Sequence, residues 1–259
     1  MSAPFVLYLA VALAASSLGL LAFVNYRERK RVEHQLKVRQ MSLAAETIED
    51  MLNTLENLSK YRPLFCTLSE ELIRRYQDLQ HFDPEASNVL VRVQRAEQLL
   101  DSYKNKGNDR AINRICSSDQ AIHKTERQLQ EIIDILIHMF NDKLIDDKQL
   151  SPLMQELEYT QLAVEVISGV AQGHRLYNEG EFVDANSHYF HAQKLSMQSK
   201  ATHPNRQRLV DELGEIINRE RLALSEDLMP ETLYNPERKT ENNPGTALEE
   251  GLGFEQHQS

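Results

Sequence analysis

The apolar and polar positions divide the chain into one continuous apolar run and a series of amphipathic stretches. No charged side chain occurs from Phe5 to Val24. A helix of this length spans about 30 Å, the thickness of the hydrocarbon core of a bilayer. After this run, apolar residues recur every three or four positions, the period of a helix with one buried face. The pattern predicts an all-α protein with one N-terminal transmembrane helix followed by a helical bundle.

The helix that follows the apolar run is expected to continue to about residue 60, because neither Gly nor Pro occurs between Gly19 and Pro63. Its apolar positions are spaced as a heptad seam, which can pack against later helices of the same chain or against a second copy. The first alternative predicts an intramolecular bundle, and the second a dimeric coiled-coil stalk. The seam consists of Met41, Ala44, Ile48, Met51, Leu55 and Leu58.

Further helices are expected over residues 64–80, 85–103 and 110–140. Asp83-Pro84 and Ser151-Pro152 each resemble an N-cap followed by a proline at the first helical position. The resulting organisation is a short extracytoplasmic end (1–4), a transmembrane helix (5–26), a basic collar with the heptad helix (27–60), a helical bundle (61–150), a helical hairpin with a capping helix (151–225) and a disordered acidic tail (226–259).

The hairpin is the most specific signal in the sequence. Small residues at Gly173 and Ala185 let two antiparallel helices approach closely, and Gly180 suits the left-handed conformation that ends the first helix. Aromatic residues fill the wedge between the helices, and a further small residue leaves room for the next helix. In order, the pattern reads Gly173, Tyr177, Gly180, Phe182, Ala185, Tyr189, Ala192 and Leu195.

Residues 166–199 resemble one tetratricopeptide repeat (TPR) in these small and aromatic positions. The unit departs from the family where Gly169 and Gln172 replace an aromatic residue and a leucine, and its closing proline is late, at Pro204. The resemblance implies a TPR-like hairpin that binds a peptide or partner helix on the concave face of its first helix. The partner-binding residues expected there are Gln172, His174, Arg175 and Asn178.

The charge of the chain is uneven. The net charge is -10, yet six basic and only two acidic residues lie between Arg27 and Arg39. A basic cluster beside an apolar span predicts a cytoplasmic membrane boundary that attracts anionic lipid headgroups. It also predicts an extracytoplasmic N-terminus, a cytoplasmic C-terminal domain and a single-pass cell-membrane protein, most simply of a bacterial inner membrane. The remaining chain is acidic, which argues against nucleic acid as a partner. The collar residues are Arg27, Arg29, Lys30 and Arg31.

The sequence contains no motif that indicates catalysis or a cofactor. It lacks a phosphate-binding glycine loop, a nucleophile elbow, an H-E-x-x-H zinc motif and a C-x-x-C pair. His188 and His191 are expected to be ordinary helix residues rather than metal ligands. We therefore expect no enzyme, cofactor or metal site, but a membrane-anchored scaffold or adaptor that binds a protein partner. The alternatives are the dimeric stalk and a non-catalytic regulatory subunit of a membrane complex.

Overall fold

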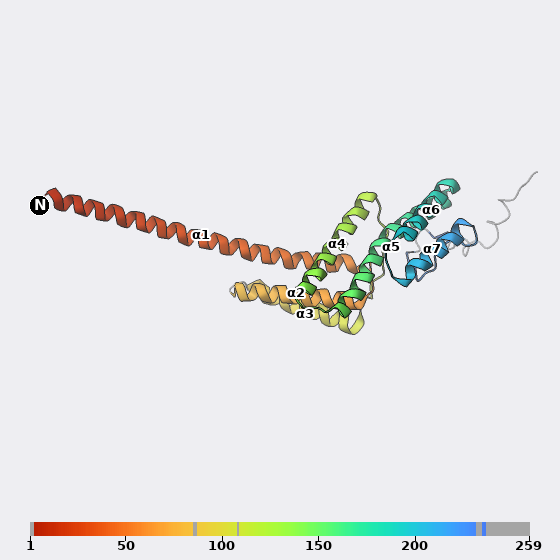
Figure 1. The fold of residues 1–259 in the computed structure, drawn as a ribbon, viewed down its shortest axis with the longest axis horizontal. Helices are drawn as coiled ribbons and strands as arrows, with labels where there is room; N and C mark the ends of the chain where they lie inside the picture. The colour runs from red at the N-terminus through yellow and green to blue at the C-terminus, as the bar shows by residue number, and fades with distance from the viewer. Residues whose placement is uncertain (1–2, 85–86, 108, 232–234, 237–259) are drawn as a thin grey trace, which may run out of the picture. The chain divides into compact units, whose positions relative to one another are not determined.

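The computed structural model describes the backbone of residues 3–84, 87–107, 109–231 and 235–236, and the side chains of these residues except 3–20, 22 and 87. Within this part, the chain forms seven helices and no strand, which confirms the all-α prediction (Figure 1). The helices are α1 (Ala3–Glu56), α2 (Arg62–Phe82), α3 (Ser87–Lys106), α4 (Asp119–Asn141), α5 (Asp147–Glu179), α6 (Phe182–Gln198) and α7 (Pro204–Ile217).

Helix α1 is a single helix of 54 residues that ends at Glu56, close to the expected end near residue 60. No helix in the described part of the chain is long and apolar enough to cross a bilayer. The apolar run expected to do so falls almost entirely on residues 5–20 and 22, whose side chains lie outside the described residues. The membrane span therefore stays a prediction.

The chain divides into two compact units. The first combines Met1–Glu49 with Leu68–Asp101, and so contains most of α1, α2 and α3. Glu46 of α1 accepts a hydrogen bond of 2.7 Å from Arg92 of α3, whose guanidinium lies 5.8 Å from the ring centroid of Tyr76 on α2. Apolar side chains fill the space between these helices: Leu68, Leu72, Leu79, Val89, Val93 and Ala96 are buried.

The heptad seam of α1 is used inside the chain. Ile48 is 1% exposed and Leu55 0%, and Met51 and Leu58 are also buried. These four side chains are buried within one chain, as an intramolecular bundle requires, whereas Met41 and Ala44 of the seam are half-buried. A stalk that dimerises through this seam would have to open the fold.

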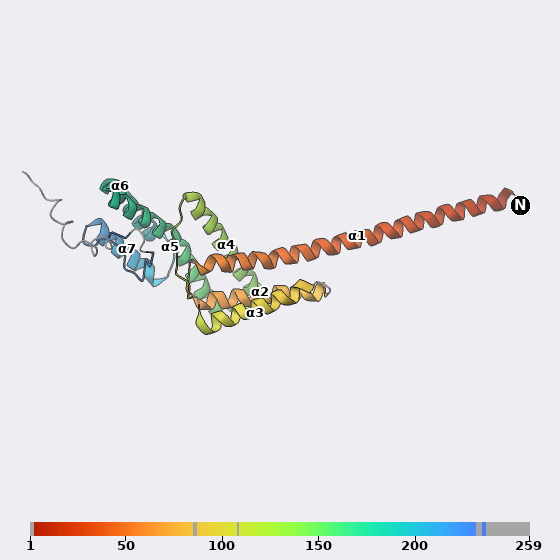
Figure 2. The ribbon, with the colours of Figure 1, turned by 180° about the vertical axis from the view of Figure 1, so that it is seen from behind.

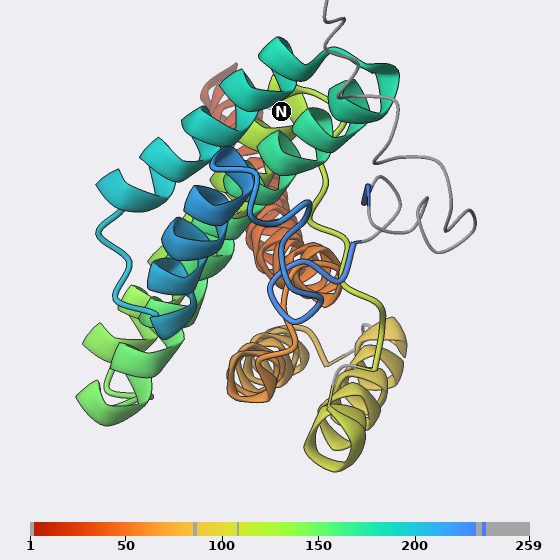
Figure 3. The same cartoon turned by 90° about the vertical axis from the view of Figure 1, so that its right-hand side faces the viewer.

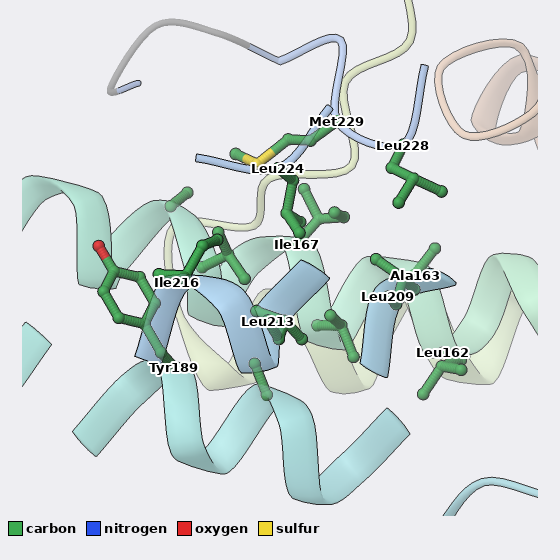
Figure 4. Packing of buried hydrophobic residues seen from close by; sticks show 14 of the residues in the cluster. Leu162, Ala163, Ile167, Tyr189, Leu209, Leu213, Ile216, Leu224, Leu228 and Met229 are labelled. Carbon is green, nitrogen blue, oxygen red and sulfur yellow. The ribbon is translucent and has the colours of Figure 1, made fainter. Parts of the chain in front are cut away.

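The second unit combines Asp50–Thr67 with Ser102–Ser259. Helix α5 packs against both α4 and α6, and α6 packs against α7 (Figures 2 and 3). The core is a continuous apolar cluster to which α5, α6, α7 and the segment after α7 all contribute (Figure 4). Its members include Leu162, Ile167, Tyr189, Leu209, Leu213, Ile216, Leu224, Leu228 and Met229.

The helix expected over residues 110–140 begins only at Asp119, with Ser118 as its N-cap. The segment before it, residues 109–118, has no regular secondary structure, and neighbouring elements bind its backbone. The N–H of Asn113 donates to the carbonyl of Asn57 at 2.7 Å, and the N–H of Cys116 donates to Ser168 Oγ at 2.9 Å. These tertiary hydrogen bonds replace the ladder that a helix would supply.

The expected helix start at Ser151-Pro152 is wrong, because α5 begins five residues earlier, with Asp146 as its N-cap and Asp147 as its first residue. Asp146 accepts a hydrogen bond from the N–H of Gln149, whose side chain accepts one from the N–H of Asp146. This reciprocal capping box satisfies two N–H groups that a helix end leaves unpaired. Pro152 then lies inside α5.

The tail expected from residue 226 is also wrong in its first part. Leu228, Met229 and Glu231 are buried in the second unit. The Glu231 carboxylate accepts hydrogen bonds of 2.8 and 2.9 Å from the Arg114 guanidinium. Arg114 also donates a hydrogen bond of 2.7 Å to the carbonyl of Leu228. Composition cannot reveal such a long-range pair, so the polar sequence around it resembles a tail. Residues 237–259, the rest of the predicted tail, lie outside the described residues.

Candidate partner-binding surface

The α5–α6 hairpin turns at Gly180, as the sequence predicts. Gly180 has a φ of 88°, and its N–H donates to the carbonyl of Tyr177 at 3.1 Å. A side chain would strain this left-handed conformation, which a glycine adopts freely. Beyond the turn, the rings of Tyr177 and Phe182 pack edge to face with centroids 5.0 Å apart. The turn therefore sets the position of the N-terminus of α6 relative to the C-terminus of α5.

The two helices of the hairpin approach closely at Gly173. A Cβ atom at this position would lie 2.5 Å from Cε1 of Tyr189, closer than two carbon atoms can come. Ala185, the other small residue of the pattern, is completely buried. Small residues therefore allow the close packing that their positions predict. Membership of the TPR family is a separate matter and stays a resemblance.

His174 is wrong as a partner-contacting residue, because it is completely buried inside the hairpin. Its Nδ1 lies 2.8 Å from the hydroxyl oxygen of Tyr189. Burial without a neighbouring acid lowers the pKa of His174 to about 4, so the imidazole is neutral at neutral pH. Its role is to hold α5 against α6.

The other three predicted contact residues do not form one surface. Arg175 is exposed, with its Nε 4.0 Å from Glu179 Oε1. Gln172 is half-buried and lies one turn before Arg175 on the outer side of α5. Asn178 is half-buried as well, but it follows the buried Ala171 by seven residues, which places it on the inner side of the helix.

An apolar surface that the sequence analysis missed lies on the outer side of α6. Val183, Phe190 and Met197 are 83%, 55% and 61% exposed. They are spaced seven residues apart and so lie on one line along the helix. The opposite side of α6 is buried against α5 through Ala185, Tyr189 and Ala192. We call these three exposed residues the α6 stripe.

The seven-residue spacing of these apolar side chains is present in the sequence, but the pattern that predicts the hairpin consists of the inward positions of α6. Charged side chains lie along one edge of the α6 stripe. At about 100° per residue, Lys194 and Asp184 lie about 40° and 120° round the helix from Phe190, on the same side. Both are exposed. The surface is thus an apolar line with one cationic and one anionic neighbour.

The basic collar lies on a part of α1 where every side chain from Phe23 to Lys37 is exposed. The ammonium of Lys30 lies 5.0 Å from the ring centroid of Tyr26, and its hydrogen bond to the Tyr26 side chain raises the pKa of Lys30. The other collar residues, Arg27, Arg29 and Arg31, are exposed. These charges are accessible to an anionic surface.

The described residues contain no group of three or more His, Cys, Asp or Glu side chains that could hold a metal ion. His191 does have a carboxylate neighbour, Glu165 of α5. Burial and the nearby Glu126 raise the pKa of Glu165, whereas His191 and His123 oppose this shift. These polar side chains come from three helices: α4, α5 and α6.

Searches against protein-family models, curated proteins and solved structures found no match to the chain. The candidate surface is therefore defined by its own geometry: the exposed α6 stripe, its two charged neighbours and the buried hairpin that supports them.

Proposed function

We propose that the protein is a membrane-anchored assembly factor, a scaffold or adaptor that binds a protein partner through the outer face of its α5–α6 hairpin. The observation that carries this proposal is the α6 stripe. Three large apolar side chains stay exposed in a line, although the other side of the same helix is packed in the core. Exposed apolar surface of this kind favours contact with another protein.

The support beneath the stripe is suited to binding. Gly173 and Tyr189 pack α6 tightly on α5, and α7 covers a second side, where the Gln193 amide donates to the carbonyl of Val210 at 3.2 Å. A rigid helix loses little conformational entropy when it binds, which favours affinity.

The anchor belongs to the same proposal. Residues 5–24 would span the membrane, and the exposed collar would contact anionic headgroups on the cytoplasmic side. Such an anchor confines the hairpin to a thin layer beside the bilayer. Binding a protein partner within that layer is the function that best fits an acidic domain without catalytic motifs.

The test is substitution of the stripe in the full-length protein, followed by cross-linking in cells and identification of the captured polypeptides. Phe190→Asp should abolish the captured bands, because it places a charge at the centre of the contact. Val91→Asp is the matched control, since Val91 is a comparably exposed apolar residue (64%) on α3 of the other unit. Arg175→Glu tests the edge of α5. If no captured polypeptide depends on Phe190, the α6 stripe is not a binding surface and the proposal falls.

A further inference from the structure

The α6 stripe has a symmetry that selects one partner. Val183 and Met197 lie seven residues before and seven residues after Phe190, so the line of apolar side chains is centred on Phe190. We propose that the stripe pairs with the same stripe of a second copy of this chain, with the two α6 helices antiparallel and the two Phe190 side chains at the two-fold axis. This inference rests on the proposed function, because it names the partner of the same surface.

Two-fold symmetry makes the contact self-complementary. In an antiparallel pair centred on Phe190, Val183 of each copy lies opposite the partner's Met197. A smaller β-branched side chain thus meets a longer unbranched one at both ends, and the two phenyl rings meet in the middle. An isologous interface requires this kind of reciprocal matching, in which one patch serves both subunits.

The charges beside the stripe also match in this arrangement. In an antiparallel pair, an edge of one helix faces the same edge of the other. Lys194 lies four residues after Phe190 and Asp184 six residues before it, both on one edge. The axial offset between Lys194 and the partner's Asp184 is therefore two residues, about 3 Å. Because Asp184 lies about 120° round the helix from Phe190, the long lysine side chain must cover this offset and also reach round the partner helix, and the arrangement then allows two identical ion pairs.

A parallel pair lacks this complementarity. In a parallel two-fold pair, the edge that carries Lys194 and Asp184 faces the other edge of the partner helix, where the uncharged Asn186 and Gln193 lie, so neither charge meets an opposite one. The charge pattern therefore favours the antiparallel arrangement over the parallel one. The proposed contact is also distinct from the heptad seam of α1, because Ile48 and Leu55 of that seam are buried within one chain.

The expected dimer is weak in dilute solution. Helix α6 has 17 residues and is about 25 Å long, so a helix pair covers less than the roughly 800 Å² per partner of a standard interface. Tethering both copies to one membrane raises their effective concentration and offsets this deficit. The experiment should therefore use the full-length protein in its membrane.

Cysteine cross-linking tests the geometry directly, in a background where the free Cys66 and Cys116 are replaced by alanine. Phe190→Cys should cross-link to its own copy under mild oxidation. Val183→Cys alone and Met197→Cys alone should not, because like positions are 14 residues, about 21 Å, apart along the antiparallel pair. Membranes holding both variants on differently tagged chains should give the mixed cross-link. Val91→Cys controls for random collision. Cross-links between two Val183→Cys chains would indicate a parallel pair and overturn the inference.

Charge exchange provides an independent test. Lys194→Asp or Asp184→Lys alone should lower the Phe190→Cys cross-linking yield at least threefold, because each creates two like-charge contacts. The double variant restores both ion pairs in reversed order and should recover the yield. A helix that was merely unfolded by the single substitutions would not be rescued by the second. Failure of the double variant to recover the yield contradicts the proposed register.

The outcomes separate this inference from the proposed function. If the cysteine variants give no dimer, but another protein is captured in a Phe190-dependent way, the stripe binds a different partner and only the homotypic pairing is overturned. If neither a second copy nor another polypeptide is captured, both proposals fall.

Discussion

The two units of the chain use polar interactions differently. In the α1–α3 unit, the Glu46–Arg92 ion pair lies at the surface, with side chains 41% and 39% exposed. In the α5–α7 unit, Arg114 and Glu231 are only 6% and 3% exposed, and His174 is buried against Tyr189. A surface ion pair can be lost at little cost, because water replaces the partner. A pair in which both side chains are buried cannot, and the second unit contains such a pair. The buried carboxylate of the first unit, Glu71 (1% exposed), is instead paired with Arg74 and Arg75, whose side chains are 36% and 38% exposed.

The largest effect is expected from breaking the buried pair. Arg114→Leu leaves the Glu231 carboxylate buried without its counter-charge, which should lower the free energy of unfolding by about 3–5 kcal/mol. Urea unfolding of the purified protein, followed by circular dichroism, measures this loss. The double variant Arg114→Leu/Glu231→Leu should recover part of it. Arg208→Leu is the control, because its partner Asp227 is 61% exposed and its second partner, Glu212, keeps an ion pair with Arg221. An effect as large as that of Arg114→Leu would refute the distinction between buried and exposed pairs.

The next largest effect is a pH dependence that arises from His174. The pKa of His174 is lowered from 6.5 to about 4 in the folded protein, so the unfolded state binds a proton more readily between these values. Stability is therefore complete above pH 6.5 and falls as the pH decreases towards 4, by about 3 kcal/mol in all. His174→Gln should remove this contribution to the slope of stability against pH, whereas the exposed His138→Gln should not. An unchanged slope in His174→Gln would assign the acid sensitivity to other groups.

A smaller loss is expected where the hairpin is tightest. Gly173→Ala adds a methyl group 2.5 Å from the Tyr189 ring and should destabilise the unit by about 1–3 kcal/mol. Gly169→Ala is a close control, because its added Cβ would meet only the Ala192 Cβ, at 4.0 Å. That substitution should be neutral or stabilising by up to about 1 kcal/mol, since alanine favours a helix. Thermal unfolding of the two variants side by side measures the difference, and equal midpoints would contradict the close approach.

The smallest effect is expected at the surface pair of the first unit. Arg92→Gln should lower stability by about 0.2–1 kcal/mol, because both side chains are partly hydrated. Salt at high concentration should reduce the difference between variant and parent, as expected for an exposed pair. A loss of several kcal/mol in urea unfolding would show that this unit also depends on particular polar residues.

Local patterns predicted a large part of this fold. An unbroken stretch without Gly or Pro gave the long α1, and Gly180 with its small and aromatic neighbours gave the α5–α6 hairpin. Both signals act over a few turns of helix, so the information lies close together in the sequence. The helix start at Asp147 was missed although its signal is local, because Ser151-Pro152 resembled a stronger one.

The packing of residues 110–118 against residues 222–231 could not be predicted in the same way. Arg114 and Glu231 are 117 positions apart, and each lies in a polar stretch that favours a helix end or a tail. Only the folded chain brings them together. The sequence identified the hairpin, but it did not show that His174 is buried or that Val183, Phe190 and Met197 are exposed on α6.

The length of α1 sets the distance between the proposed membrane span and the buried residues at the other end of the helix. If residues 5–24 lie in the bilayer, as proposed above, the completely buried Ala45 lies about 30 Å further along the helix. Removing seven residues between Val32 and Leu43 would lower the folded part by about 10 Å and turn it by only about 20°. Removing five would turn it by about 140°. With that proposed anchor, the distance of Ala45 from the membrane and the direction in which it faces could therefore be varied separately by changing the length of α1.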